Sequence, residues 1–321
     1  MPHKVAEDLA HYIIKHSCGE KVEIMWFGGE PLYNMDAIDT ICEILKQNNI
    51  EFFSKMISNS YLFDDSILQK ATQLWNLKWL QVTLDGTEKI YNRTKSYIYN
   101  DSNAFERVFE NIGKVLDVGI TINIRLNLTS LNASDLNILV DKIYKKYGTD
   151  KNLIIYVNTL YNSTGLKKDE LNPKALFALK IALQNKIYSY GYNSLKRTQK
   201  SLKINACMSD NDSSITVLPM GQLGKCEHYS EGDYCGSIYK EDLNLDIINK
   251  FKERSPEYPK CNDCLLYPDC FRLKVCGEKA DCVEDLRLNK INRIYTLMEN
   301  TYNFYKNNNA NIVSDEFEVQ C

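Results

Sequence analysis

The sequence predicts an α/β fold in its first half and a small cysteine-rich region in its last third. Two observations carry this prediction. Strand-like and helix-like segments alternate up to about residue 160, and eight of the eleven cysteines fall between Cys207 and Cys282. Strands that alternate with helices pair in parallel through right-handed crossovers, which gives a sheet or barrel covered by helices. With 321 residues, the chain can form one large domain and a satellite.

The elements are expected in regular alternation. Strands are expected over Lys21–Phe27, Phe52–Asn59, Trp79–Asp85, Thr121–Leu128 and Leu153–Thr159. Apolar residues at helical spacing predict helices between them, over Met35–Gln47, Asp65–Trp75, Ala104–Asp117 and Ala133–Tyr147. Further helices are expected over about Pro173–Tyr190 and, as the closing element, over Glu284–Tyr305.

Two of these strands alternate between apolar and polar residues, although buried parallel strands are normally apolar throughout. The polar sets are Gln81, Thr83 and Asp85 on one strand, and Asn123, Arg125 and Asn127 on the next. An edge strand with one solvent-exposed face would explain the polar residues of either strand taken alone. Two neighbouring sets favour a lumen or cleft that holds a polar ligand.

Composition excludes several classes of protein. A charged fraction of 25 % and a net charge of −3 do not indicate a nucleic-acid groove. No apolar run approaches the roughly 20 residues that span a bilayer. There is no signal peptide and the cysteine count is odd, so a reducing cytoplasm is the expected setting. We therefore expect neither a nucleic acid nor a membrane as partner.

The cysteine spacing predicts metal ligation. Five cysteines form the run Cys261-x2-Cys264-x5-Cys270-x5-Cys276-x5-Cys282, and Cys207, Cys226 and Cys235 precede it. Two zinc sites usually show two Cys-x2-Cys knuckles, whereas this chain has one and spreads its other thiols singly. That pattern favours iron–sulfur clusters, with zinc as the alternative and a disulfide knot third. Single cysteines such as Cys18 and Cys42 are expected to be buried hydrophobes.

A glycine pair ends the first strand, in the segment Gly28-Gly29-Glu30-Pro31. Glycines let the backbone turn sharply and approach a ligand. Glu30 then lies at the carboxyl end of a parallel strand, where α/β barrels place their chemistry. A carboxylate beside open backbone amides fits a free amino acid moiety. A plain strand-to-helix turn with an exposed Glu is the alternative.

Together these motifs resemble a radical S-adenosylmethionine protein with a C-terminal SPASM domain, the group that includes anaerobic sulfatase-maturating enzymes and peptide maturases. The matching segments are Trp26–Leu32, Ile57–Asn59, Val82–Gly86, Ile124–Asn127 and the cysteine run from Cys207 to Cys270. Ser60 stands where the family has a glycine. The resemblance implies a cofactor shell for S-adenosylmethionine. That shell is Gly28, Gly29, Glu30, Pro31, Asn59, Thr83, Asp85, Arg125 and Asn127.

The resemblance also implies the domain organisation. It gives a partial (β/α)6 barrel without its first strand over residues 1–190, a bridge over 191–206, a SPASM domain with closing helix over 207–306, and a loose tail over 307–321. One or two auxiliary 4Fe-4S clusters are implied. By the match, Cys261, Cys264, Cys270 and Cys282 hold one cluster, and Cys207, Cys226 and Cys276 the other, with Cys235 as a substitute ligand. The gaps around Cys276 and Cys282 depart from the family pattern.

One family motif is absent from the sequence. Members carry a Cys-x3-Cys-x2-Cys loop ahead of the Gly-Gly-Glu motif, and its cluster cleaves S-adenosylmethionine to a 5′-deoxyadenosyl radical. Here Cys18 is the sole cysteine before Gly28. The expectation is a fragment or degenerate form of a peptide- or protein-modifying maturase that cannot cleave S-adenosylmethionine. Its partners would be a peptide or protein substrate and a reductant such as flavodoxin or ferredoxin. The alternative is a non-catalytic iron–sulfur or zinc scaffold that binds peptides.

Overall fold

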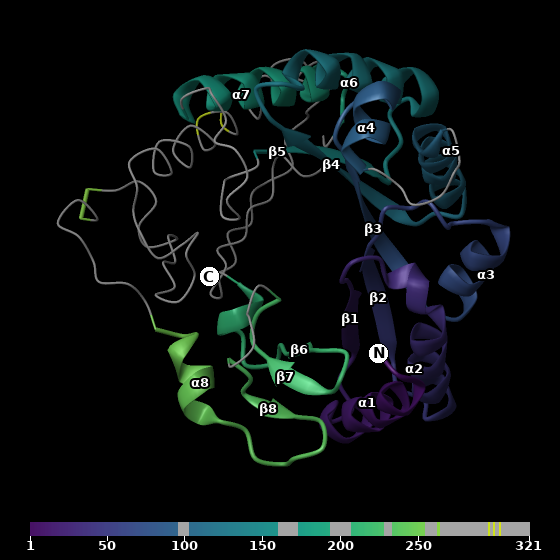
Figure 1. Cartoon of the computed structure of the whole chain (residues 1–321), viewed down its shortest axis with the longest axis vertical. Helices are drawn as coiled ribbons and strands as arrows, with labels where there is room; N and C mark the ends of the chain where they lie inside the picture. The colour runs from purple at the N-terminus through teal and green to yellow at the C-terminus, as the bar shows by residue number, and fades with distance from the viewer. Residues whose placement is uncertain are drawn as a thin grey trace, which may run out of the picture.

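The protein is built around a five-stranded parallel sheet in the order β1-β2-β3-β4-β5. This computed structural model describes residues 1–95, 103–159, 173–192, 207–227 and 233–253, together with residues 262, 263, 295, 298 and 302. The sheet forms an arc with α2, α3, α5, α6 and α7 on its outer side (Figure 1). An α/β architecture with a parallel sheet is therefore confirmed, in agreement with a partial barrel.

The element bounds lie close to those that the sequence predicts. The strands are β1 (Val22–Trp26), β2 (Phe52–Ile57), β3 (Leu77–Leu84), β4 (Thr121–Leu128) and β5 (Leu153–Thr159). The helices are α1 (His3–His16), η1 (Pro31–Asn34), α2 (Met35–Gln47), α3 (Asp65–Gln73), α4 (Glu88–Lys95), α5 (Ala104–Asp117), α6 (Ala133–Tyr147) and α7 (Pro173–Ser189). Helix α4 is not among the helices that the sequence predicts.

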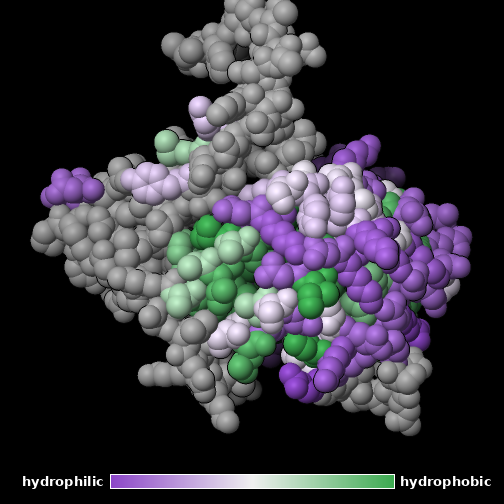
Figure 2. All heavy atoms as spheres, turned by 90° about the horizontal axis from the view of Figure 1, so that it is seen from above, coloured by the Kyte–Doolittle hydropathy of each residue, from purple (hydrophilic) through white to green (hydrophobic). Residues whose placement is uncertain are grey.

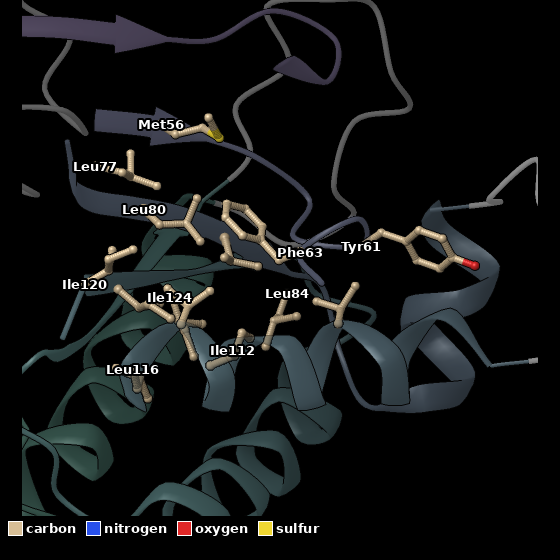
Figure 3. Close-up of a cluster of buried hydrophobic side chains, with 14 of the residues drawn as sticks. Met56, Tyr61, Phe63, Leu77, Leu80, Leu84, Ile112, Leu116, Ile120 and Ile124 are labelled. Atoms are coloured by element: carbon tan, nitrogen blue, oxygen red, sulfur yellow. The ribbon is translucent and has the colours of Figure 1, made fainter. Parts of the chain in front are cut away.

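Alternation along the strands separates an apolar outer face from a polar inner face. In β4, Ile122, Ile124, Leu126 and Leu128 are fully buried. They pack with residues of β2, β3 and α5 in one cluster, where Leu80, Ile112 and Ile124 point toward one another (Figure 3). This burial is the main stabilising contribution, at about 25 cal/mol per Å² of apolar surface removed from water.

The inner face carries the polar side chains that the sequence places there. Gln81 pairs in register with Asn123, and Thr83 with Arg125. Each of these four side chains is half-buried, whereas the intervening residues are buried. Strands β3 and β4 lie inside the sheet, so the interpretation as a wet edge strand is wrong. Both polar sets therefore line the concave side of the sheet.

The C-terminal part contributes a small antiparallel sheet of β6 (Thr216–Val217), β7 (Gln222–Gly224) and β8 (Gly236–Ser237), followed by α8 (Leu245–Lys250). This sheet lies beside α1 and β1 (Figure 1). Val217 and Ile238 pack against the main core, and Lys15 of α1 forms an ion pair with Glu241. The two regions therefore share a packed boundary on α1. Strands of two or three residues leave no periodicity, which is why the sequence does not predict them.

Helix α7 covers the last strand of the sheet. The side-chain Oε1 of Gln184 accepts a hydrogen bond from the backbone N–H of Val157 in β5, with 3.2 Å between the atoms. Pairing of this kind blunts the exposed edge of a sheet.

Seen from above, hydrophobic residues gather over α7 beside the hydrophilic surface of α6 (Figure 2). Among the described residues, no helix is long and apolar enough to cross a membrane.

Several sequence predictions fall on residues outside the described ranges. Of the closing helix expected over residues 284–305, only Tyr295, Met298 and Tyr302 are described, and all three are helical. The run of cysteines from Cys261 to Cys282 lies outside the described residues. The SPASM domain and its boundaries therefore stay predictions.

Candidate functional site

The candidate site lies at the carboxyl end of the parallel sheet, on its inner face. Parallel strands bring their carboxyl ends to one edge, where ligands of α/β proteins bind. Register places Arg125 of β4 between Thr83 of β3 and Tyr156 of β5. The next inner position pairs Asn127 with Asn158. Five polar side chains from three strands therefore share one surface.

A chain of polar contacts links four residues at this edge. The Nε of Arg125 donates to Oδ1 of Asn127 at 3.0 Å, and Nδ2 of Asn127 donates to Oδ1 of Asp85 at 2.9 Å. The other carboxylate oxygen of Asp85 lies 3.0 Å from Nζ of Lys95. Asp85 is buried, with 6 % of its surface exposed, and these two partners take both of its carboxylate oxygens. Three of the four residues were predicted, and the structure brings them together.

The guanidinium of Arg125 is fixed at one side and open at the other. Its Nε is taken by Asn127, while its two terminal nitrogens have no hydrogen-bond partner among the described residues. A half-buried guanidinium with both terminal nitrogens open fits the two oxygens of a carboxylate. Beside it, the Tyr156 hydroxyl donates to Oε1 of Gln81 at 2.8 Å. Burial raises the pKa of the Tyr156 phenol, and the charge of Arg125 offsets part of this shift.

Glu30 joins the loops that follow β1 and β2. Its Oε1 accepts from the Ser58 hydroxyl at 2.8 Å and from the backbone N–H of Leu32 at 3.1 Å. Its Oε2 accepts from the backbone N–H of Asn59 at 2.8 Å. Burial raises the pKa of the Glu30 carboxyl, although these three hydrogen bonds lower it in part. The side chain thus holds the site's framework and keeps acceptor capacity at Oε2 for one further donor.

The loop after β2 has a conformation that its sequence does not favour. Ser60 has a φ of 64°, in the left-handed region, and it is fully buried. Its hydroxyl has no hydrogen-bond partner in the described part of the chain. Asn59 tightens the same loop, because its Oδ1 accepts from the backbone N–H of Tyr61 at 2.8 Å. A glycine would fit the backbone of position 60 without strain.

The glycine pair after β1 is open on one side. Gly28 has a φ of 148°, and a Cβ built on Gly28 or Gly29 would meet no atom within 4 Å. Pro31 is the first residue of η1, where its missing N–H leaves no helical bond unmade. The backbone at Gly28 and Gly29 is therefore exposed, and its contact with a ligand stays a prediction.

The predicted shell forms two groups. Glu30 and Asn59 are linked at the ends of β1 and β2, and Asp85, Arg125 and Asn127 are linked at the ends of β3 and β4. Thr83 lies in register with Arg125. Four residues outside the predicted cofactor shell complete these groups. They are Ser58, Lys95, Asn132 and Tyr156. Two of them had a signal in the sequence, since Ser58 lies in the matching segment Ile57–Asn59 and Tyr156 occupies an inner position of β5.

Three of the cysteines predicted to bind metal lie in the described ranges. Cys207 and Cys226 are half-buried. Cys235 is fully buried, and its Sγ lies 3.4 Å from the backbone oxygen of Leu223. Burial raises the pKa of the Cys235 thiol. Among the described residues, no three acidic, histidine or cysteine side chains gather at a common point, so the cluster assignments stay predictions. Cys42 is buried as expected, whereas the expectation for Cys18 is wrong, because it is exposed.

Comparisons with known proteins match the first part of the chain to a family and the chain's fold to solved structures. Residues 1–143 match the family model described as the radical SAM superfamily. Solved structures of anSMEcpe, an anaerobic sulfatase-maturating enzyme, are similar in fold. One, with bound AdoMet, has a TM-score of 0.65 and 18 % identity over 97 % of this chain and 90 % of that one. Another, with AdoMet and the Kp18Cys peptide, has a TM-score of 0.63 and 17 % identity over 97 % and 91 %.

A third similar structure is SuiB of Streptococcus suis bound to its precursor peptide SuiA. It has a TM-score of 0.56 and 15 % identity, and the match covers 88 % of this chain and 65 % of SuiB. No curated protein matches the sequence significantly. At these identities the structures establish the fold alone. Residues 1–143, which contain strands β1 to β4, thus match the radical SAM family model.

Proposed function

We propose that the protein binds S-adenosylmethionine on the inner face of its parallel sheet and acts on a peptide or protein substrate, as a maturase-type enzyme does. The open guanidinium of Arg125, fixed by Asn127 at the carboxyl end of β4, carries this proposal. It is a preformed site for a carboxylate, and its register neighbours Thr83 and Tyr156 are uncharged polar side chains. A family match over residues 1–143 supports the choice of ligand.

The residues present fit the amino acid end of S-adenosylmethionine. Arg125 would hold the carboxylate through its terminal nitrogens. The open backbone at Gly28 and Gly29 and the remaining acceptor capacity of Glu30 would meet the ammonium group. Asp85 would act indirectly, because both its oxygens are taken by Asn127 and Lys95. Thr83 adds a half-buried hydroxyl beside Arg125.

A peptide substrate is supported by the neighbours. Structures of anSMEcpe and SuiB with similar folds contain peptides. We propose that the cysteines between Cys207 and Cys282 hold one or two auxiliary iron–sulfur clusters, which a flavodoxin or ferredoxin would reduce. Such clusters supply electron transfer when bound. The single Cys-x2-Cys pair, Cys261 and Cys264, favours iron–sulfur ligation over zinc.

Binding of S-adenosylmethionine to the full chain tests the proposal. Radiolabelled S-adenosylmethionine should bind in equilibrium dialysis under anaerobic conditions. A charge-assisted hydrogen bond contributes about 1.5–3 kcal/mol, so Arg125→Gln should weaken binding about tenfold to a hundredfold. Lys78→Gln, an exposed position near the amino end of β3, should leave the dissociation constant within about twofold. Equal weakening by both variants, or no binding to the parent chain, contradicts the proposal.

A non-catalytic peptide-binding scaffold is the second candidate. The observation that favours it is the absence of any Cys-x3-Cys-x2-Cys spacing in these 321 residues. This second candidate predicts that the chain binds S-adenosylmethionine without cleaving it. Chromatography after incubation with dithionite should detect no 5′-deoxyadenosine. Clear formation of 5′-deoxyadenosine would show that another set of cysteines holds a catalytic cluster.

A further inference from the structure

Asn132, a buried residue between β4 and α6, has a role that its position does not suggest. It is the N-cap residue of α6 and 7 % exposed. An N-cap Asn normally accepts a hydrogen bond from a backbone N–H in the first turn of its own helix. Asn103 and Asn244 do this for α5 and α8. Asn132 makes no such bond to α6.

The amide of Asn132 is used instead to join the ends of two strands. Its Nδ2 donates to the backbone oxygen of Asp85 and to that of Asn127, each at 2.8 Å. Its Oδ1 accepts from the backbone N–H of Thr129 at 2.8 Å and from the Thr129 hydroxyl at 3.1 Å. Both donor hydrogens and both acceptor lone pairs are therefore satisfied. Asn132 therefore makes these four contacts in place of a hydrogen bond that caps α6.

The two residues joined in this way carry the polar chain of the candidate site. Asp85 and Asn127 are also linked through their side chains at 2.9 Å, and Asn127 orients Arg125. The backbone bonds from Asn132 set the separation of the two strand ends, on which the side-chain bond between Asp85 and Asn127 depends. A shift of a few tenths of an ångström there would move the guanidinium of Arg125.

We propose that Asn132 is a positioning residue, which holds the ends of β3 and β4 so that Arg125 faces the ligand. The part that concerns the ligand rests on the proposed function. Asn132 itself does not reach the ligand, because its amide is fully used by backbone groups and Thr129. Its substitution should therefore alter ligand affinity through geometry and not through a lost contact.

The test compares Asn132→Ala with two controls in the full chain. Asn137→Ala removes an exposed amide on α6 that donates only to the Ala133 backbone at 3.2 Å. Ile143→Val removes one methylene from the buried face of α6, which controls for a general loss of stability. Asn132→Ala should raise the dissociation constant for S-adenosylmethionine about tenfold. Both controls should stay within about twofold of the parent chain.

Amide hydrogen exchange of the unliganded protein supplies a second readout. In Asn132→Ala, exchange should rise in residues 84–88 and 126–130, whereas neither control should change these segments selectively. Unchanged exchange there overturns the inference, as does an affinity loss no greater than that of Ile143→Val. If the parent chain binds no S-adenosylmethionine, the proposed function fails. The exchange comparison then still decides whether Asn132 holds the strand ends.

Discussion

The carboxylate of Glu30, in the loop after β1, accepts a hydrogen bond from the backbone N–H of Asn59, in the loop after β2, with 2.8 Å between the atoms. Ser58 and Leu32 donate to the same carboxylate. A residue that the sequence marks as a ligand contact thus also fixes the two loops that frame the site. Because Glu30 is largely buried, the ionisation of its carboxyl group affects the stability of the folded protein as well as ligand binding.

The first prediction concerns pH. Burial raises the pKa of Glu30 in the folded protein, so the folded state binds this proton more tightly than the unfolded state. The stability that Glu30 contributes is then fully present below its unfolded pKa of about 4.3 and is lost as pH rises through the higher folded value. Urea unfolding of the parent and Glu30→Gln should show the parent's relative stability falling from pH 4 to pH 7. A relative stability that grows over this range would mean that the hydrogen bonds outweigh burial.

The second prediction concerns the loop after β2. Ser60→Gly removes a left-handed backbone strain and a buried hydroxyl without a partner in the described part of the chain. We expect a gain of about 1 kcal/mol in the free energy of unfolding, after the entropic cost of a glycine in the unfolded chain. Asn49→Gly is the control, since Asn49 has a φ of 57° but is exposed and of a type that tolerates this region. Loss of stability in Ser60→Gly would show that the hydroxyl has a partner that the described residues lack.

The third prediction concerns the metal. Anaerobic reconstitution should give a brown protein with iron and sulfide close to two 4Fe-4S clusters and negligible zinc. Replacing Cys261 and Cys264 by Ala should remove about one cluster, whereas Cys18→Ala, at an exposed position, should leave the iron content unchanged. Iron and sulfide assays with electron paramagnetic resonance measure this. A colourless protein with stoichiometric zinc after competition with iron would refute the assignment.

The fourth prediction concerns β1, which is an edge of the described sheet. Met25 is 37 % exposed, and the Trp26 indole N–H has no hydrogen-bond partner among the described residues. An apolar strand edge templates association, so the chain should self-associate through β1. Met25→Lys should reduce this association, in size-exclusion chromatography with light scattering. A parent chain that is already monomeric, with Trp26 shielded from quenchers, would count against it.

Sequence periodicity predicted most of the main sheet. Strands β4 and β5 and helices α2, α5 and α6 begin and end where the pattern predicts, because each buries a regular apolar stripe. Helix α4 was missed since Tyr91 is its only buried residue. Strand β2 ends at Ile57, two residues before the predicted end, because Ser58 and Asn59 turn toward Glu30.

The site could be predicted only in part. Arg125, Asn127 and Asp85 stand out because polar residues at inner positions of internal strands break an apolar pattern. Asn132 leaves no such signal, since loops are polar anyway and its partner Asp85 is distant in sequence. Ser58 lies in a matching segment, but nothing near it in the sequence marks its contact with Glu30. Contacts between a side chain and a remote backbone group follow from the fold and not from local spacing.

Hydrogen–deuterium exchange of the full chain with and without S-adenosylmethionine tests the central claim most directly. Bound ligand should protect the carboxyl ends of the sheet, in residues 28–32, 58–61, 83–87 and 125–129, because it contacts these segments and reduces their local opening. The same ligand should leave Arg125→Gln much less protected at equal concentration. Protection in those segments of the parent chain is the result we expect. No protection, or protection confined to residues 207–253, would contradict the account.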